Sequence, residues 1–286
     1  MNQSVRKLLS LILKGLGCLF IVAIAMLIYG FFIEPGLLIA NHQTKSDWPL
    51  KPIRIVFFSD LHMGSPHINA RYVDDLISRI NETRPDLILI GGDLLINGVV
   101  GGHYVEITEV AFRLAQLKAN LGVFAVLGNH DWWNNGDNII QNLTRAGITV
   151  LENESKKLIL TPDSTFQLIG IGDHLTGHTN LERAFANVDP SLPAIVFMHD
   201  PGAILELRKN FKLAFAGHMH GGQVFVPGIG ALVTPSVAPK LWAKGWVDLP
   251  IGKLFVSVGI GTSILPLRLN AIPEFVVLDL NSNDAK

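Results

Sequence analysis

Cysteine and charge are both scarce in this sequence. Of its 286 residues only Cys18 is a cysteine, which excludes a disulfide framework and any zinc site built from thiolates. Charged residues make up 16% of the chain, against about 25% in a typical soluble domain, and hydrophobic residues make up 49%. This balance excludes a disordered or acidic-tail protein. The net charge of −1 argues against a basic nucleic-acid-binding surface, so we expect no nucleic-acid partner.

Charge is scarcest at the N-terminus. Residues 1–44 carry four of the 47 charged side chains (23 basic and 24 acidic), and residues 15–33 are 19 consecutive uncharged, mostly apolar residues. As a helix this run would measure about 28 Å, close to the ~30 Å hydrocarbon core of a bilayer. It exceeds the apolar core of a signal peptide, and no clear A-x-A cleavage site follows it. We therefore predict an uncleaved transmembrane helix over about 15–33; a cleaved signal peptide and a buried core helix are the alternatives.

The basic residues around this span bear on its orientation. Three of them, Arg6, Lys7 and Lys14, precede the span, and Lys45 and Lys51 follow it. The positive-inside rule then favours an N-terminus inside and a body outside the membrane. A margin of one charge leaves the face of the body open.

After a polar segment at about 41–51, read as a linker, the chain alternates buried-strand and amphipathic-helix patterns. Continuous apolar or β-branched runs predict strands at 53–59, 86–90, 123–127, 166–171, 194–198, 213–216, 254–258 and 275–280. Apolar residues at helical spacing predict helices at 71–80, 107–117 and 137–146. The pattern is typical of an α/β protein, whose loops at the strand ends carry the polar residues.

Five polar groups interrupt the apolar runs where strands are expected to end. They are Ser59-Asp60-Leu61-His62, Gly91-Gly92-Asp93, Gly128-Asn129-His130-Asp131, Met198-His199-Asp200 and Gly217-His218-Met219-His220-Gly221. Ligands in α/β sheets bind at the carboxyl ends of strands, so these groups can converge. Carboxylate, amide and imidazole donors without thiolates suit manganese, iron or zinc. One aspartate after a strand is usually a turn or a helix cap, so the prediction depends on the whole set.

The order D-x-H, G-G-D, G-N-H-D, H and G-H-x-H, over about residues 51–282, resembles the calcineurin-like metallophosphoesterases. The resemblance implies a four-layer α/β fold, a β-sandwich flanked by helices, that holds two divalent ions, with Mn favoured over Fe or Zn. With the apolar N-terminus, we predict a division into 1–44, a membrane anchor and the start of a linker, and 45–286, the catalytic domain. The resemblance also implies a role for each motif residue: Asp60, His62 and His220 for one metal, Asp93 bridging both, Asn129, His199 and His218 for the other, and His130 as a catalytic histidine that binds no metal.

The implied reaction is hydrolysis of a P–O bond by a metal-bridging hydroxide. Two ions about 3.5–4 Å apart can bind phosphoryl oxygens and lower the pKa of a bridging water. His130 would stabilise the transition state or protonate the leaving oxygen. Asp131 would orient His130 or be an ordinary loop carboxylate. A metal-stabilised binding module without activity is the alternative, and the presence of both Asp93 and His130 favours an enzyme.

Three further features narrow the resemblance: the apolar N-terminus, the GHMHGGQ segment and the GIGTSILPLRLNAIPE segment. With them the chain most resembles the membrane-associated bacterial YkuE/YaeI-like phosphodiesterase branch, which implies a single-pass protein of the bacterial inner membrane. Gln223, Arg268 and Glu274 match that branch, and Arg268 would bind phosphate or pair with a carboxylate.

The resemblance also bears on the substrate. Some members of the branch are UDP-2,3-diacylglucosamine pyrophosphatases, which makes a lipid-linked phosphoester or pyrophosphate an expected substrate. That chemistry is cytoplasmic, whereas the charge bias favours an outside body, so a periplasmic or cell-wall phosphodiester is the alternative. The loop at 231–247 would rest on a bilayer, admit an acyl chain, or pack over the sheet.

The remaining candidates carry weaker signals. Asp173 lies at a predicted strand end and is a candidate neighbour of the site. Trp132 and Trp133 would wall the pocket or pack in the core. Five histidines match no motif and are predicted to be surface or loop residues: His42, His67, His103, His174 and His178.

Overall fold

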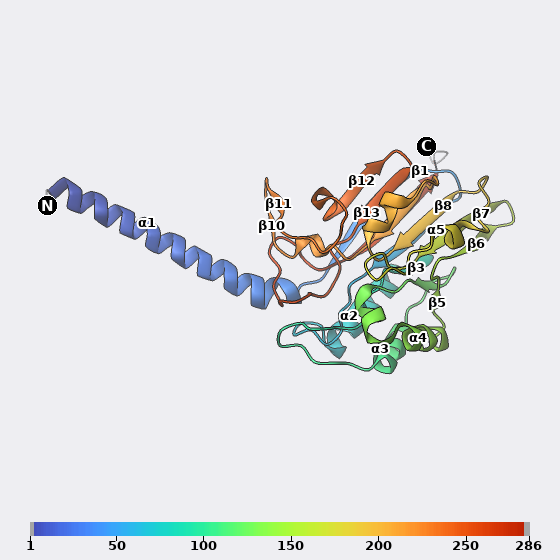
Figure 1. The fold of residues 1–286 in the computed structure, drawn as a ribbon, viewed down its shortest axis with the longest axis horizontal. Coiled ribbons are helices and arrows are strands. Elements are labelled where there is room, and N and C mark those ends of the chain that lie inside the picture. The colour runs from blue at the N-terminus through green and yellow to red at the C-terminus, as the bar shows by residue number, and fades with distance from the viewer. Residues whose placement is uncertain (1–2, 283–286) are drawn as a thin grey trace.

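The computed structural model describes residues 3–282, as a long helix and a two-sheet body (Figure 1). Helix α1 (Gln3–Ile28) projects away from the body and continues through a π-helical turn, η1 (Tyr29–Ile33), and a 3₁₀ turn, η2 (Glu34–Gly36). The stretch Leu9–Gly36 is 28 residues long, contains the predicted span and includes an 18-residue window with a mean hydropathy of 2.7. By length and composition it could cross a membrane.

Two six-stranded sheets form the body. The first has the order β1-β14-β2-β3-β4-β5 and the second β12-β13-β9-β8-β7-β6. The strands of the first sheet are β1 (Ile39–Trp48), β2 (Ile53–Phe58), β3 (Leu87–Ile90), β4 (Val123–Ala125), β5 (Thr149–Val150) and β14 (Glu274–Ser282). Those of the second are β6 (Glu154–Thr161), β7 (Ser164–Ile171), β8 (Ala194–Met198), β9 (Leu213–Ala216), β12 (Gly245–Leu249) and β13 (Gly252–Val256).

The sheets pack face to face through an apolar core. The rings of Phe57 in β2 and Phe215 in β9 stack with their centroids 5.1 Å apart, and Trp48 meets Phe166 edge-on at 5.7 Å. Strands buried on both faces need no polar alternation, which explains the continuous apolar runs at β2, β3 and β8.

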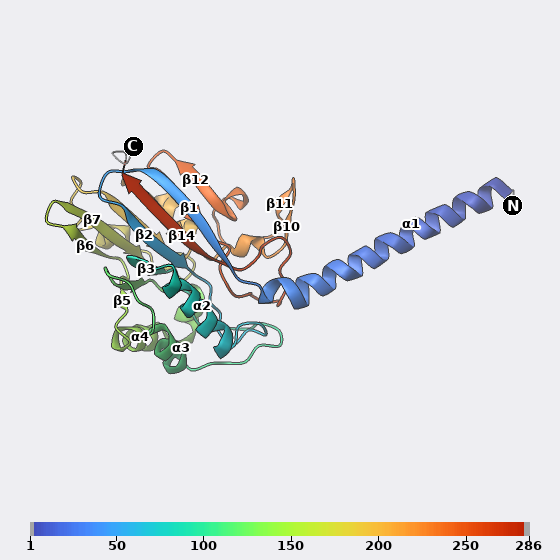
Figure 2. The same cartoon turned by 180° about the vertical axis from the view of Figure 1, so that it is seen from behind.

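Helices and short turns cover the outer faces. The four helices of the body are α2 (Ala70–Glu82), α3 (Ile107–Leu114), α4 (Asn129–Arg145) and α5 (Leu181–Phe185). Helices α2, α3 and α4 pack on the first sheet (Figure 2). α2 illustrates why: Asn69 caps it by accepting from Tyr72 N–H, and Val73, Leu76 and Ile80 lie on its buried face. The α/β sandwich flanked by helices is therefore confirmed.

Several boundaries differ from the sequence predictions. Residues 39–48 are not a linker, because they form β1, the edge strand paired in parallel with β14. An edge strand with polar, partly exposed side chains lacks the apolar run that identifies a buried strand. The helix predicted at 137–146 starts at Asn129, inside the G-N-H-D motif. The sequence prediction also missed β6 and β12.

Parallel pairing sets the position of the polar groups. β2, β3 and β4 are parallel neighbours, as are β8 and β9, so the strands within each set end at the same edge of their sheet. The polar groups follow these five strands, as predicted.

Candidate metal centre

The eight predicted site residues lie together and are buried, with none more than 6% exposed. Asp60 and His62 follow β2, Asp93 follows β3, Asn129 and His130 follow β4, His199 follows β8, and His218 and His220 follow β9. A buried set this rich in carboxylate and imidazole needs ions or hydrogen bonds to offset its desolvation.

The backbone at this site is unusual. Five of the eight residues have a left-handed φ, from 44° to 66°: Asp60, His62, Asp93, His218 and His220. Within residues 3–282 ten non-glycine residues have a positive φ, so half of them belong to this site. Each costs on the order of 1–3 kcal/mol, and such strain concentrates at functional sites.

The two carboxylate oxygens of Asp93 do different things. Oδ1 accepts the backbone N–H of His130 at 2.8 Å. Oδ2 lies 3.5 Å from His62 Nε2 and 3.2 Å from His199 Nε2. One oxygen thus fixes the G-N-H-D turn, and the other faces histidines from two different sheets. Gly128 makes this approach possible, because a Cβ there would overlap Asp93 Oδ1.

The first group of possible ligands is Asp60, His62 and His220, whose ligand atoms lie within 4.8 Å of one another. Asp60 Oδ1 is 3.4 Å from His220 Nε2, and both Asp60 oxygens accept the backbone N–H of His218 at 3.1 Å. His62 Nε2 is buried without a hydrogen-bond partner. A buried nitrogen without a partner, beside two carboxylates, is typical of a metal ligand.

The second group contains Asp93, His199 and His218, again within 4.8 Å. His199 Nε2 lies 3.2 Å from Asn129 Oδ1 and 3.1 Å from His218 Nδ1. His199 Nδ1 lies 2.7 Å from the Gly91 carbonyl, so Nδ1 carries the proton and donates it there. In the neutral ring this leaves a lone pair on Nε2, as in histidines that bind metals.

His130 belongs to a third group, with His62 and Asp93, whose ligand atoms also lie within 4.8 Å of one another. Its ring meets His62 edge-on at 4.6 Å and Trp133 at 5.0 Å, and its Nδ1 is buried without a partner. Its backbone is held by Asp93 and by Asn134, which donates to the His130 carbonyl at 2.8 Å. The ring is therefore positioned beside the cluster with a free nitrogen.

Burial and charge set the protonation of the cluster. Burial lowers the pKa of His62 to about 3, and burial together with the Arg268 charge takes the pKa of His220 well below its usual range. Burial also lowers the pKa of His199, but the Asp93, Asp60 and Asp173 charges outweigh it and raise that pKa well above its usual range. Burial raises the pKa of Asp93, and nearby histidine charge reverses this and leaves it well below its usual range. The cluster therefore favours an ionised Asp93, neutral His62 and His220 rings, and positive charge at His199.

Comparison with known proteins agrees with this geometry. Residues 53–222 match the family model described as calcineurin-like phosphoesterase. The chain belongs to the calcineurin-like phosphoesterase family. It is therefore a metal-dependent phosphoester hydrolase, and the family implies divalent metal ions.

Relatives extend the likeness beyond the matched segment. The chain is 30% identical to the uncharacterized metallophosphoesterase YkuE of Bacillus subtilis, over 90% of each chain. It is 33% identical to phosphodiesterase YaeI of Escherichia coli, over 88% of this chain and 92% of that one. A Bos taurus transmembrane protein with a metallophosphoesterase domain is 28% identical over 82% of this chain and 54% of its own length. A 5'-nucleotidase precursor from Thermus thermophilus superposes with a TM-score of 0.45 and 14% identity, over 73% of this chain and 49% of that chain.

The residues fit the divalent ions that this family implies. The donors are carboxylate, amide and imidazole groups, the free Nε2 of His62 faces Asp93, and His199 Nδ1 donates to a backbone carbonyl, as the outer nitrogen of a metal-binding histidine does. Hard and borderline donors of this kind suit Mn, Fe or Zn.

Two carboxylates outside the proposed ligand set accept hydrogen bonds from the backbone of the motif loops. Asp131 does not orient the His130 ring: its carboxylate accepts from the backbone N–H groups of Asp93, Leu94 and Gly128 at 2.8–3.0 Å, which ties two motif loops together.

Glu152 is the second of these carboxylates. Its Oε1 accepts from Leu127 N–H at 2.7 Å, and its Oε2 is buried without a partner. Burial raises the pKa of Glu152 to about 8. The sequence analysis missed Glu152, because no motif contains it.

Arg268 is fully buried, and within residues 3–282 it forms no ion pair with a carboxylate. It donates to the Gly261, Val258 and Ala271 carbonyls, and its Nη2 lies 3.5 Å from His220 Nδ1. Burial lowers the pKa of Arg268 to about 10, which leaves it charged. Through these hydrogen bonds Arg268 stabilises the loop backbone next to His220.

The other residues singled out in the sequence, Asp173, the two tryptophans and the five histidines outside the motifs, lie in different surroundings. Asp173 is fully buried, accepts from Thr176, and its charge acts on His199. Trp133 lies against His130, whereas Trp132 stacks on His178 at 3.6 Å. The five histidines outside the motifs are exposed or half-buried, as predicted.

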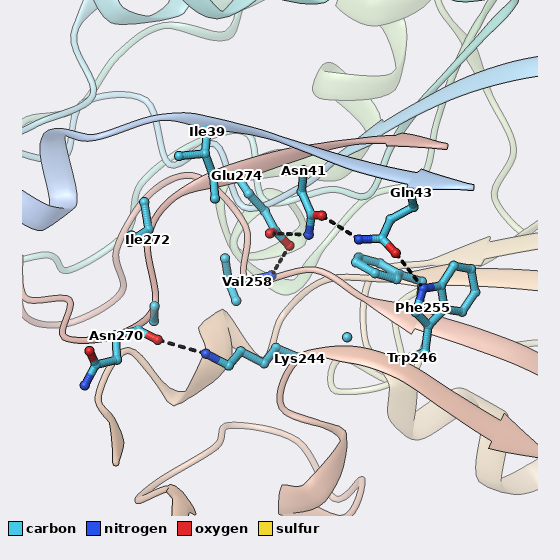
Figure 3. Close-up of a pocket in the computed structure, with 12 residues that line it drawn as sticks. Ile39, Asn41, Gln43, Lys244, Trp246, Phe255, Val258, Asn270, Ile272 and Glu274 are labelled. Atoms are coloured by element: carbon cyan, nitrogen blue, oxygen red, sulfur yellow. Dashed lines mark hydrogen bonds between the residues drawn. The ribbon is translucent and has the colours of Figure 1, made fainter. Parts of the chain in front are cut away.

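Two of the cavities in the described chain bear on the site. The larger, about 620 Å³, opens between β1 and β12 and contains none of the eight site residues (Figure 3). Asn41, Gln43, Trp246 and Glu274 line it and bond to one another. The smaller, about 320 Å³, contains His220 and has a mainly apolar lining from residues such as Met219, Val233, Ile264 and Leu265. We call the smaller one the His220 groove.

Proposed function

We propose that this phosphoesterase is anchored to a membrane by α1 and uses two divalent ions to hydrolyse a phosphodiester or pyrophosphate. The ligand sets are Asp60, His62 and His220 for one ion and Asn129, His199 and His218 for the other, with Asp93 shared and manganese favoured. In this proposal residues 1–44 anchor and residues 45–286 catalyse. Strand β1 includes residues on both sides of the boundary at 44/45, so this boundary separates two functions and not two independently folded domains.

One observation carries the proposal. Asp93 Oδ2 lies within 3.5 Å of histidines that belong to the two separate ligand groups, while Oδ1 is occupied by the His130 N–H. A carboxylate oxygen between two groups of imidazole and carboxylate donors would be suited to bind a pair of cations.

Two ions bound there would supply Lewis acidity to the phosphoryl oxygens and lower the pKa of a bound water. The chain's own residues do the rest. The carboxylates of Asp60 and Asp93 would offset the ions' charge, and the ring of His130 presents a nitrogen at the edge of the cluster, from which it can stabilise or protonate the leaving oxygen. Asp131 and Arg268 hold the loops that position these ligands.

We further propose a lipid-linked substrate such as UDP-2,3-diacylglucosamine. The His220 groove supports it, because an apolar channel beside a metal ligand suits an acyl chain next to the scissile phosphate. A periplasmic or cell-wall phosphodiester is the second candidate, favoured by the basic residues before the span. In both cases we place the protein in the bacterial inner membrane with one span.

The test is Mn²⁺-dependent hydrolysis by the detergent-purified full chain of two substrates, an aryl phosphodiester and UDP-2,3-diacylglucosamine. Asp93→Ala and His130→Ala are the variants, and metal content and circular dichroism report on binding and folding. Turnover of both substrates, lost in both variants, supports the full proposal.

The outcomes separate its parts. Cleavage of the aryl phosphodiester alone supports the two-metal phosphodiesterase and removes the lipid substrate. Metal binding without hydrolysis of either substrate contradicts catalysis and leaves a metal-stabilised binding module.

A further inference from the structure

Exposed apolar side chains are concentrated in one part of the body. Within the described chain beyond η2, sixteen large hydrophobic residues are exposed, and seven of them come from residues 229–241 and 264–265. These seven, which we call the apolar rim, are Ile229, Leu232, Val233, Val237, Leu241, Ile264 and Leu265. Leu241 is 91% exposed and Ile229 is 73% exposed. Single exposed hydrophobics are ordinary, whereas a cluster of this kind marks an interaction surface.

The apolar rim lies on the side of the body from which α1 leaves. Ile229 is in the turn of the small hairpin of β10 (Phe225–Val226) and β11 (Gly230–Ala231), and both views show this hairpin beside the end of the long helix (Figures 1 and 2). The hairpin is joined to the segment that follows Ile264 and Leu265, since Phe225 N–H donates to the Leu269 carbonyl at 2.9 Å.

That same segment fixes the end of the helix. Arg268 N–H donates to the Gly30 carbonyl at 2.9 Å, and Ala271 N–H donates to Glu34 Oε1 at 2.6 Å. His67 Nε2 lies 2.8 Å from the Phe31 carbonyl. Glu34 is 1% exposed, so its carboxylate is committed to this contact. The helix end and the apolar rim are therefore held by one set of hydrogen bonds, not joined by a free linker.

We propose that the apolar rim docks on the surface of the bilayer that α1 spans; this rests on the anchor in the proposed function. The rim continues the apolar surface of the helix end, where Phe32 is 73% exposed and Ile33 is 48% exposed. A bilayer is the occupant that the position of α1 selects, because the helix enters it beside the rim.

Charge supports the same partner. Residues 224–247, which include most of the rim, contain two lysines, Lys240 and Lys244, and no acidic residue. Trp242 and Trp246 lie in the same segment. Lysine and tryptophan beside apolar residues are typical of surfaces at the headgroup level of a membrane.

Docking would bring the active site to the membrane. Val233, Ile264 and Leu265 belong both to the apolar rim and to the lining of the His220 groove. The groove then opens on the docked face, and an amphiphilic phosphoester reaches the metal ligands without leaving the bilayer surface.

The test measures where single side chains lie relative to lipid. In a Cys18→Ser background of the full chain, Ile229→Cys and Leu241→Cys carry nitroxide labels on the rim. Phe112→Cys and Ile159→Cys are matched controls, because these residues are 72% and 66% exposed elsewhere on the body. Phe32→Cys is the reference at the helix end. The protein is loaded with diamagnetic Zn²⁺ and reconstituted in phosphatidylcholine vesicles, and power saturation compares accessibility to oxygen and to a water-soluble nickel chelate.

Docking predicts that both rim labels share the Phe32 pattern, high oxygen and low chelate accessibility, while both controls are aqueous. Rim labels as aqueous as the controls would overturn it, whether the rim then meets a protein or only water. An aqueous label at Phe32 would refute the anchor as well. Hydrolysis of an aryl phosphodiester by the same labelled proteins is read separately, so failure of docking and failure of catalysis are distinguishable.

Discussion

The metal cluster and the large cavity between β1 and β12 differ in how their polar atoms are paired. In the large cavity Trp246 donates to Gln43, Gln43 to Asn41, and Asn41 to Glu274, at 2.6–3.0 Å. None of the buried unpaired polar side-chain atoms identified in the described chain belongs to a residue that lines it. The metal cluster, by contrast, contains unpaired ring nitrogens of His62, His130 and His218.

Two glutamates with buried carboxylate oxygens show the same contrast. Glu274, at the cavity, accepts from Asn41 with one oxygen and from Ser257 and Val258 with the other. Glu152, behind the metal cluster, has one oxygen paired and one unpaired. Unpaired buried polar atoms are costly, so a fold that keeps them has a use for them or binds something there. The incomplete pairing, not the volume, identifies the reactive region.

The largest expected effect is at Asp93. In Asp93→Asn the shape is kept but the shared charge is lost, so both ligand groups are weakened. We expect activity to fall by more than the ~10–100-fold typical of losing an outer partner of a metal ligand. Hydrolysis rate and metal content by mass spectrometry measure it. Glu274→Gln makes the same kind of change at the large cavity and should keep the hydrolysis rate and the metal content of the parent. An Asp93→Asn variant that stays active and fully metal-loaded would contradict the contrast between the two regions.

His130→Ala should lower the hydrolysis rate by about 10²–10⁴-fold, the usual contribution of a positioned acid or base. Metal content should be unchanged, because His130 is proposed to bind no metal. His178→Ala is the matched control, since His178 is exposed and stacks on the neighbouring Trp132. Loss of metal in His130→Ala would contradict the assigned role.

Glu152 predicts a pH effect on stability. Its pKa is about 8 in the folded protein against 4.5 for an ordinary glutamate. The folded state therefore keeps a proton that the unfolded state releases, and stability is lost as pH rises from about 4.5 through 8, by at most ~1.4 kcal/mol per pH unit.

Glu152→Gln keeps an acceptor for Leu127 N–H and removes this titration. Relative to the parent, the free energy of unfolding of the variant should increase between pH 5 and pH 8 in urea titrations of metal-free protein. Equal pH dependence of the two proteins would show that Glu152 is ionised in the fold.

The smallest effect is expected at Gln43. In Gln43→Ala, hydrogen bonds to Asn41 and Trp246 are lost at a half-exposed site, at a cost of about 0.5–1.5 kcal/mol. Thermal unfolding measures this, and hydrolysis and metal content should match the parent. A large loss of activity would mean that the cavity between β1 and β12 serves the reaction.

The sequence predicted the parts of the molecule that local patterns encode. β2, β3 and β8 are buried on both faces and read as apolar runs, and the motif loops that follow them bring all eight site residues together. β1 was missed because a partly exposed edge strand alternates polar residues and resembles a linker.

The roles of supporting residues could not be predicted, because they depend on partners distant in sequence. Asp131 bonds to the backbone of Asp93, and Arg268 to carbonyls from two loops. The raised pKa of Glu152 comes from burial of its carboxyl group and from the charges of Asp173 and Asp131. Contacts between residues so distant in sequence leave no local sequence pattern from which they could be predicted.

The central claim is that Asp93 joins two metal ions in one centre. Electron paramagnetic resonance of the Mn²⁺-loaded full chain tests it most directly, since ions about 3.5–4 Å apart that share a carboxylate are exchange-coupled. The account predicts a coupled spectrum in the parent protein that disappears in Asp93→Asn. The spectrum of isolated Mn²⁺ in the parent, at full metal loading, would contradict it.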